Sequence, residues 1–108
     1  MKPLSDVCPD PKTVLDLEPE KLGRHVLSCL GDTNEPNIKR AIIARTLASN
    51  YHQSFYDQIA SAIERALDWL LAQCLLGSTP NDQNLIFLTR QGKEAATAYA
   101  AEHPVDIA

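Results

Sequence analysis

The chain has 108 residues, of which 44% are hydrophobic and 22% charged, and its formal net charge at pH 7 is -4. These values predict one small globular domain and exclude collagen-like or low-complexity structure. The negative charge argues against strong non-specific binding to nucleic acid, which needs clustered lysine and arginine. A chain with this net charge can still carry a local basic patch.

The sequence also bears on the compartment. It has no run of about 18 uncharged apolar residues, and no apolar run follows Lys2, so we expect neither a membrane span nor a signal peptide. Three cysteines are too few for a disulfide framework, and we expect a cytoplasmic protein. Cys29 and Cys74 fall on apolar faces of predicted helices, where a free thiol packs as a small hydrophobe, whereas Cys8 has no evident role.

The two ends of the chain are expected to be irregular. Residues 1–12 carry three prolines and two aspartates and predict an irregular tail, and residues 104–108 predict a second tail. One domain then spans 13–103. Its first five residues, 13–17, are partly β-branched and predict a short strand or an extended lead-in.

Three helices follow in the sequence. The first begins at Pro19 and ends at Gly31, because proline suits the first helical turn and glycine suits the end. The second is expected to begin at Pro36 and to end near Ser49. The third is expected to begin at Ser54, which forms a capping-box pattern with Asp57. Each helix has one apolar stripe at helical spacing. The stripe of the first helix contains Leu22, Val26, Cys29 and Leu30, and that of the second contains Ile38, Ile42, Ile43 and Leu47. The stripe of the third helix is the broadest and contains Phe55, Ile59, Ala62, Ile63, Ala66, Leu67, Leu70, Leu71 and Cys74.

A β-hairpin and a fourth helix complete the predicted order. Residues 79–84 are all compatible with a turn, and the apolar run 85–88 after them predicts a strand. Thr89 is a good N-cap for an alanine-rich helix from Arg90 to about Glu102, and Pro104 ends it. The fold class is therefore mainly α with a small β-hairpin, in the order helix, helix, long helix, hairpin, helix.

This order, together with the residues after the hairpin, resembles the winged-helix superfamily. Leu88, Thr89 and Gly92 match a leucine–threonine–x–x–glycine step that is common in bacterial regulators of the multiple-antibiotic-resistance and PadR-like types. The resemblance covers about residues 13–102 in architecture, but its sequence signal is confined to the last third. It implies a helix-turn-helix protein that acts in transcription regulation as a dimer, with its third helix in the major groove and its wing on the backbone or minor groove.

Carried onto this sequence, the groove face would hold Gln58, Ser61, Glu64, Arg65 and Asp68, in which two carboxylates outnumber one arginine. The hairpin has Asp82 and no lysine or arginine, so the usual cationic wing is missing. Lys21, Arg24, Lys39, Arg40 and Arg45 could form a basic surface on the first two helices, or could be an ordinary solvated face. The predicted DNA-binding residues are Arg24, Lys39, Arg40, Ser61, Arg65, Arg90 and Lys93.

The second hypothesis is a protein-interaction module on the same fold, without DNA binding. The acidic balance, the carboxylates on the third helix and the wing without cations favour it, and Trp69, Phe87 and Tyr99 are its predicted partner-binding residues. No motif for catalysis, phosphate binding or metal binding occurs, and His25, His52 and His103 are scattered. We therefore expect no enzyme activity, no cofactor and no metal. We expect double-stranded DNA or another protein as partner, and a homodimer that forms through the fourth helix and the N-terminal segment.

Overall fold

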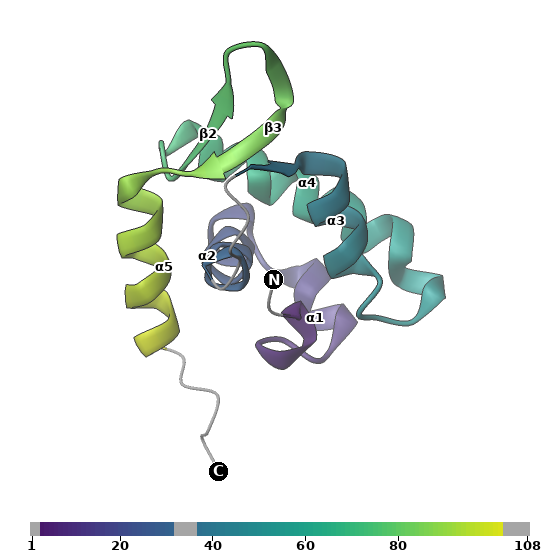
Figure 1. The fold of residues 1–108 in the computed structure, drawn as a ribbon. Helices are drawn as coiled ribbons and strands as arrows, with labels where there is room; N and C mark the ends of the chain where they lie inside the picture. Colours follow the sequence, from purple (N-terminus) through teal and green to yellow (C-terminus); the bar gives the residue numbers. More distant parts are fainter. Residues whose placement is uncertain (1–2, 32–36, 103–108) are drawn as a thin grey trace.

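A computed structural model of the protein describes residues 3–31 and 37–102, and it describes side chains as far as residue 99. Five helices of four or more residues and a three-stranded antiparallel sheet make up this part of the chain (Figure 1). The predicted class, mainly α with a small β-hairpin, is confirmed. The elements are the 3-10 helix η1 (Leu4–Asp6), α1 (Pro11–Asp16), α2 (Pro19–Leu30), β1 (Ile38–Lys39), α3 (Arg40–Ala48), the 3-10 helix η2 (Gln53–Phe55), α4 (Tyr56–Ala72), β2 (Leu76–Thr79), β3 (Asp82–Leu88) and α5 (Arg90–Glu102).

Helix α4 is the centre of the core, as its broad apolar stripe predicted. It packs against α2 and α3, and α5 packs against the far side of α2. Ile59, Ile63, Leu67 and Leu70 are fully buried on α4. The predicted stripe of α2 is buried as well, and α2 ends before Gly31 as expected.

The amino-terminal segment differs from the prediction, because it is folded and packed into the core. Asp10 caps α1: its Oδ1 accepts a hydrogen bond from the Lys12 backbone N–H at 3.0 Å, and Pro11 occupies the first helical turn. Leu4 and Val14 are fully buried and Cys8 is 7% exposed. The irregular tail predicted up to residue 12 is therefore wrong for the described residues, and so is the short strand or extended lead-in predicted over 13–17, because α1 continues to Asp16.

The start of the second helix also differs from the prediction. Ile38 and Lys39 form the short strand β1, which pairs with Ile86 and Leu85 of β3, and α3 begins only at Arg40. The strand order β1-β3-β2 places β3 in the middle of the sheet. Residues 32–36 lie outside the described residues, as do the predicted tail 104–108, Pro104 and His103.

The hairpin of β2 and β3 is confirmed, with a shorter turn than predicted. Only Pro80 and Asn81 separate the strands, and across this turn the Thr79 hydroxyl donates a hydrogen bond to the Asp82 carbonyl oxygen at 2.7 Å. The register of the two strands shifts between Ser78 and Thr79, as at a β-bulge. Leu76 and Ile86 fix the base of the hairpin in the core, where they are 3% and 1% exposed. The tip projects from the helical body (Figure 1).

Both ends of α4 differ in detail from the prediction. His52 Nδ1 accepts the Ser54 backbone N–H at 3.1 Å and begins η2, so Ser54 does not form the expected capping box. At the other end Cys74 adopts φ 61°, and the Leu75 N–H donates to the Leu70 carbonyl oxygen in a Schellman arrangement. This turn carries Cys74 off the apolar stripe and leaves it exposed, whereas Cys29 is buried as predicted.

The leucine–threonine–x–x–glycine step joins the hairpin to α5. The Thr89 hydroxyl oxygen accepts the Gly92 N–H at 2.9 Å, which confirms Thr89 as the N-cap. The Thr89 N–H donates to the Leu75 carbonyl oxygen at 3.3 Å, so the two ends of the hairpin are held together. Gly92 lies directly against that carbonyl group, and a Cβ at Gly92 would overlap it.

Candidate functional site

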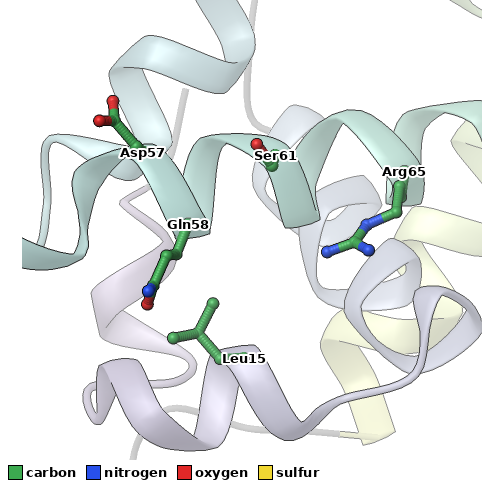
Figure 2. Close-up of a pocket in the computed structure, with 5 residues that line it drawn as sticks. All are labelled: Leu15, Asp57, Gln58, Ser61 and Arg65. Carbon is green, nitrogen blue, oxygen red and sulfur yellow. The ribbon is translucent and has the colours of Figure 1, made fainter.

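The side of α4 that faces away from the core is the surface on which the predicted groove residues meet. We call it the outer face of α4. Within the described side chains it consists of Asp57, Gln58, Ser61, Glu64, Arg65 and Asp68. Ser61 and Arg65 are exposed, as their predicted role required, and they lie together on this face (Figure 2).

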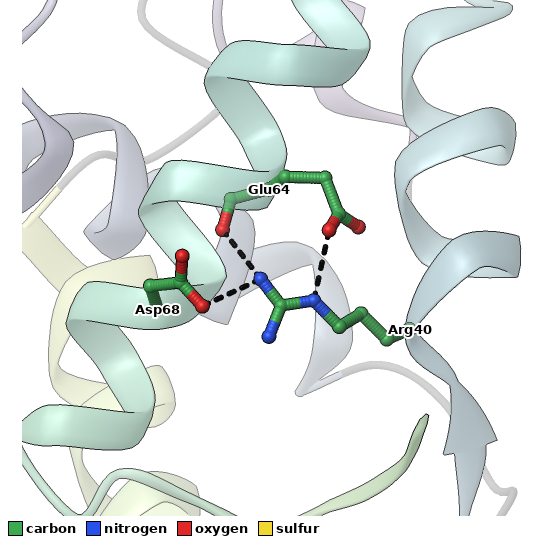
Figure 3. A network of polar contacts seen from close by, with 3 residues as sticks. All are labelled: Arg40, Glu64 and Asp68. Atoms are coloured by element: carbon green, nitrogen blue, oxygen red, sulfur yellow. Dashed lines mark hydrogen bonds and ion pairs between the residues drawn. The ribbon is translucent and has the colours of Figure 1, made fainter. Parts of the chain in front are cut away.

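Arg40 spans from the start of α3 to this face and binds two of its carboxylates (Figure 3). Its Nε donates to Glu64 Oε2 at 2.9 Å, and its Nη2 donates to Asp68 Oδ1 at 2.6 Å and to the Glu64 carbonyl oxygen at 2.9 Å. These contacts use the Nε and Nη2 donors of the guanidinium, a group whose planar fork of donors matches carboxylate geometry. The like-charge pair Glu64 and Asp68 is thereby neutralised in part by a residue that lies 24 positions before Glu64 in the sequence.

This network removes Arg40 from the set of cations that could meet a phosphate group. The Arg40 side chain is 19% exposed, whereas Glu64 and Asp68 are 41% and 66% exposed. Burial lowers the pKa of Arg40, but its hydrogen bonds to Asp68 and Glu64 outweigh that effect and raise the pKa above its ordinary value. A phosphate that bound Arg40 through Nε or Nη2 would have to compete with Glu64 and Asp68.

A groove runs along the other flank of α4, where α1 lies beside it. The groove has a volume of about 500 Å³ and is lined by Leu15, Asp57, Gln58, Ser61 and Arg65. Gln58 faces Leu15 across the groove, whereas Asp57 and Ser61 point away from Leu15 (Figure 2). Arg65 forms no ion pair with a described residue, so its guanidinium is available to a ligand.

A second, more polar pocket of about 400 Å³ lies where α3, α4 and the hairpin meet. It is lined by Arg40, Ala41, Glu64, Asp68, Gln83 and Asn84. The carboxylates and the two amide side chains make this region rich in hydrogen-bond acceptors and poor in available cations. The hairpin therefore extends the outer face of α4 without adding positive charge.

The remaining predicted cations are dispersed. Arg24 on α2 binds Glu20 at 3.1 Å and lies 5.4 Å from the centre of the Tyr99 ring. Arg90 approaches Glu94 at 3.9 Å on α5, where Lys93 is also exposed. Lys39 lies on β1 beside Leu85. Since α3 packs on α4, and α5 packs on α2, the cations of α5 do not join those of α3 in one patch.

The three aromatic residues predicted to bind a partner each pack within the chain. Trp69 is half-buried against α2, where Gly23 lies so close that a Cβ would come within 2.9 Å of the Trp69 ring. The Phe87 ring covers Gly77 on the neighbouring strand, and a Cβ there would be 2.6 Å from the ring. Tyr99 holds Arg24. They lie on three different elements, α4, β3 and α5.

Tyr51 and Cys8, whose pKa values are raised, have structural roles. The Tyr51 hydroxyl donates to the Cys8 carbonyl oxygen at 2.6 Å, and burial, with the thiols of Cys8 and Cys29 nearby, raises the pKa of Tyr51 above its usual range. Burial, with a smaller effect of Asp10, raises the pKa of the Cys8 thiol. Within residues 3–31 and 37–102, no three histidine, cysteine or acidic residues are placed to hold a metal ion.

Sequence reasoning missed the contacts that define this site. The Arg40 network joins α3 to α4, and Leu15 comes from a segment that was not predicted as a helix. The available signal was the acidic pair Glu64 and Asp68, since two carboxylates one helical turn apart repel each other and a cation between them would relieve that repulsion. Among the described helices none is long and apolar enough to pass through a bilayer. No protein-family model, curated protein or solved structure matches this chain, so its function must be inferred from its own residues.

Proposed function

We propose that the chain is a winged-helix domain without catalytic activity, and that it binds a partner protein through the outer face of α4 and the adjoining hairpin. The order of helices, the hairpin with its fixed base and the leucine–threonine–x–x–glycine step support the winged-helix assignment. Fold alone does not decide between DNA and protein as partner, so the choice rests on the surface.

The observation that carries this proposal is the Arg40 network. Four carboxylates, of Asp57, Glu64, Asp68 and Asp82, lie on the outer face of α4 and the hairpin, against two guanidinium groups. One of these, Arg40, is already bound by Glu64 and Asp68. A surface with excess negative charge repels phosphate, whereas lysine or arginine side chains of a protein partner would find acceptors there.

A photo-crosslinking experiment tests the partner class. We expect a photoreactive phenylalanine analogue at Ser61 to give, in cells, a discrete adduct that protease removes and nuclease leaves unchanged, because Ser61 is exposed at the centre of the outer face. The same analogue at Thr97, exposed on α5, serves as the control: it should give at most a dimer of this chain and not this adduct. An adduct at Ser61 that nuclease removes would overturn the proposal in favour of DNA.

DNA binding remains a second candidate because Arg65 is exposed on the outer face beside Ser61 and has no ion-pair partner among the described residues. In this alternative Arg65 and Lys39 contact phosphates on either side of α4, and Glu64 and Asp68 weaken the binding.

The double variant Glu64→Gln with Asp68→Asn tests this. It removes two negative charges and releases Arg40, so we expect the dissociation constant for a random-sequence duplex at 50 mM salt to fall about tenfold, with a steeper salt dependence. Fluorescence anisotropy of a labelled duplex measures both quantities. The matched control, Glu20→Gln with Glu94→Gln, changes the charge equally elsewhere and should have a smaller effect. Tight binding by the unmodified chain, unchanged in the double variant, would contradict our account of the carboxylates.

The compartment and the assembly state belong to the same proposal. We place the domain in the cytoplasm because its three cysteines are free and Cys74 is exposed, a state that a reducing compartment maintains. A homodimer through α5 stays a prediction, and the exposed Thr97 and Ala98 are the described residues that would meet a second copy.

A further inference from the structure

Ile42 departs from the predicted apolar stripe of the second helix. Ile43 and Leu47 are buried against α4 as expected, but Ile42 is 47% exposed, and it is the one large hydrophobic side chain in the described part of the chain that is exposed. An exposed isoleucine by itself is unremarkable on a protein surface. Its neighbours on the same side of α3 give it significance.

Two cations flank Ile42 one helical turn away on either side. Lys39 lies three residues before it and Arg45 three residues after it, both exposed, and neither forms an ion pair with a described residue. Residues three and four apart share a helix face, so Ile42, Arg45 and Thr46 lie on one exposed face of α3. Together with Lys39 and Ser49, the residues that cap the two ends of the helix, they make a stripe that we call the α3 stripe.

We infer that the α3 stripe binds an acidic amphipathic helix of another protein, with one apolar residue of that helix on Ile42 and carboxylates on Lys39 and Arg45. A partner helix presents side chains on one face at steps of three or four residues, so acid, apolar and acid residues at such steps match the stripe. Charge complementarity selects this occupant, because the two cations stand out on a chain whose net charge is -4.

The isoleucine distinguishes this occupant from a phosphate backbone. A phosphate-binding stripe needs the cations alone and gains nothing from an apolar group between them. A partner helix gains from covering Ile42, since burial of an apolar side chain in an interface contributes much of the binding energy. The α3 stripe contains no residue of the outer face of α4, so the two surfaces can fail or succeed separately.

Selection of random 12-residue peptides displayed on phage, against the immobilised full chain, tests the inference. We expect the enriched peptides to place an apolar residue between acidic residues at steps of three or four. By isothermal titration, the best synthetic peptide should lose about tenfold or more in affinity when Ile42→Asp is introduced. Arg45→Glu should weaken it similarly, and a peptide with lysine in place of its acids should then bind this variant better than the original peptide does.

Controls separate this surface from the other. Ser61→Ala and Asp57→Asn, on the outer face of α4, should leave the peptide affinity unchanged. The inference is overturned if no peptide is enriched, if the enriched peptides lack acids, or if they bind the Ile42→Asp variant as tightly as the original chain. It is also overturned if Lys39→Glu and Arg45→Glu abolish binding to duplex DNA while Ile42→Ala leaves it intact, because the stripe would then be a phosphate site.

Discussion

Gly92→Ala should destabilise the fold by about 3 kcal/mol or more, although alanine is the better helix former. Alanine gains up to about 1 kcal/mol over glycine inside a helix. Against this, the new Cβ would overlap the Leu75 carbonyl oxygen, which accepts the Thr89 N–H and thereby holds the base of the hairpin. Because the obstacle is backbone rather than a flexible side chain, the hairpin and α5 must move apart.

Urea unfolding followed by circular dichroism measures this loss. Lys93→Ala provides the control, since Lys93 is the next residue of α5 and is exposed, and its removal should change the free energy of unfolding by less than about 0.5 kcal/mol. A Gly92→Ala variant as stable as the original chain would show that the close approach of Gly92 to Leu75 is not a constraint on the fold. The leucine–threonine–x–x–glycine step would then need another explanation.

Leu4→Ala should lower the free energy of unfolding by about 2 to 5 kcal/mol, the range for leucine in a packed core. Leu4 is fully buried, and its backbone N–H donates to the Asn50 side-chain oxygen at 2.8 Å. The substitution leaves the hydrogen bond possible and removes the packing. The effect therefore reports directly on the burial of the amino-terminal segment.

The same chemical denaturation measures this effect, with Asp6→Ala as the control because Asp6 lies in the same 3-10 helix and is exposed. We expect the control to change stability by less than about 0.5 kcal/mol. If Leu4→Ala behaved like Asp6→Ala, residues 3–8 would not be part of the core. The prediction of an irregular tail would then be restored.

Local signals predicted the long elements of the fold well. The apolar periodicity of α2 and α4, Pro19 at a helix start and Thr89 at an N-cap all act within a few residues, and each is found where it was expected. The amino-terminal helix carried a signal of the same kind in Asp10-Pro11, a cap followed by a first-turn proline. Three prolines and a charged composition led to the prediction of a tail instead.

Elements that depend on distant partners could not be derived in this way. Strand β1 is two residues long, and it exists because Ile38 pairs with Ile86, which is 48 positions later. Cys74 continues the helical spacing, but the positive φ that ends α4 turns it to solvent. Periodicity describes an unbroken helix and does not reveal where the backbone leaves it.

The candidate site was predicted in its composition and not in its contacts. Ser61 and Arg65 were placed on the exposed side of α4 from spacing alone, and the excess of carboxylates on that side was noted. Arg40 was grouped with the available cations because its charge is visible in the sequence, whereas its partners are not. Its ion pairs with Glu64 and Asp68 follow from the packing of α3 on α4, which no local pattern specifies.

The anchoring of the amino-terminal segment has a consequence for the order of assembly during synthesis. Residues 3–17 leave the ribosome before the rest of the described chain, but two of their attachment points, Asn50 and Tyr51, are translated more than 30 residues later. Because contacts between distant positions form only after the intervening chain is available, we expect this segment to dock late. Until then its buried leucine and valine stay accessible to chaperones in the nascent protein.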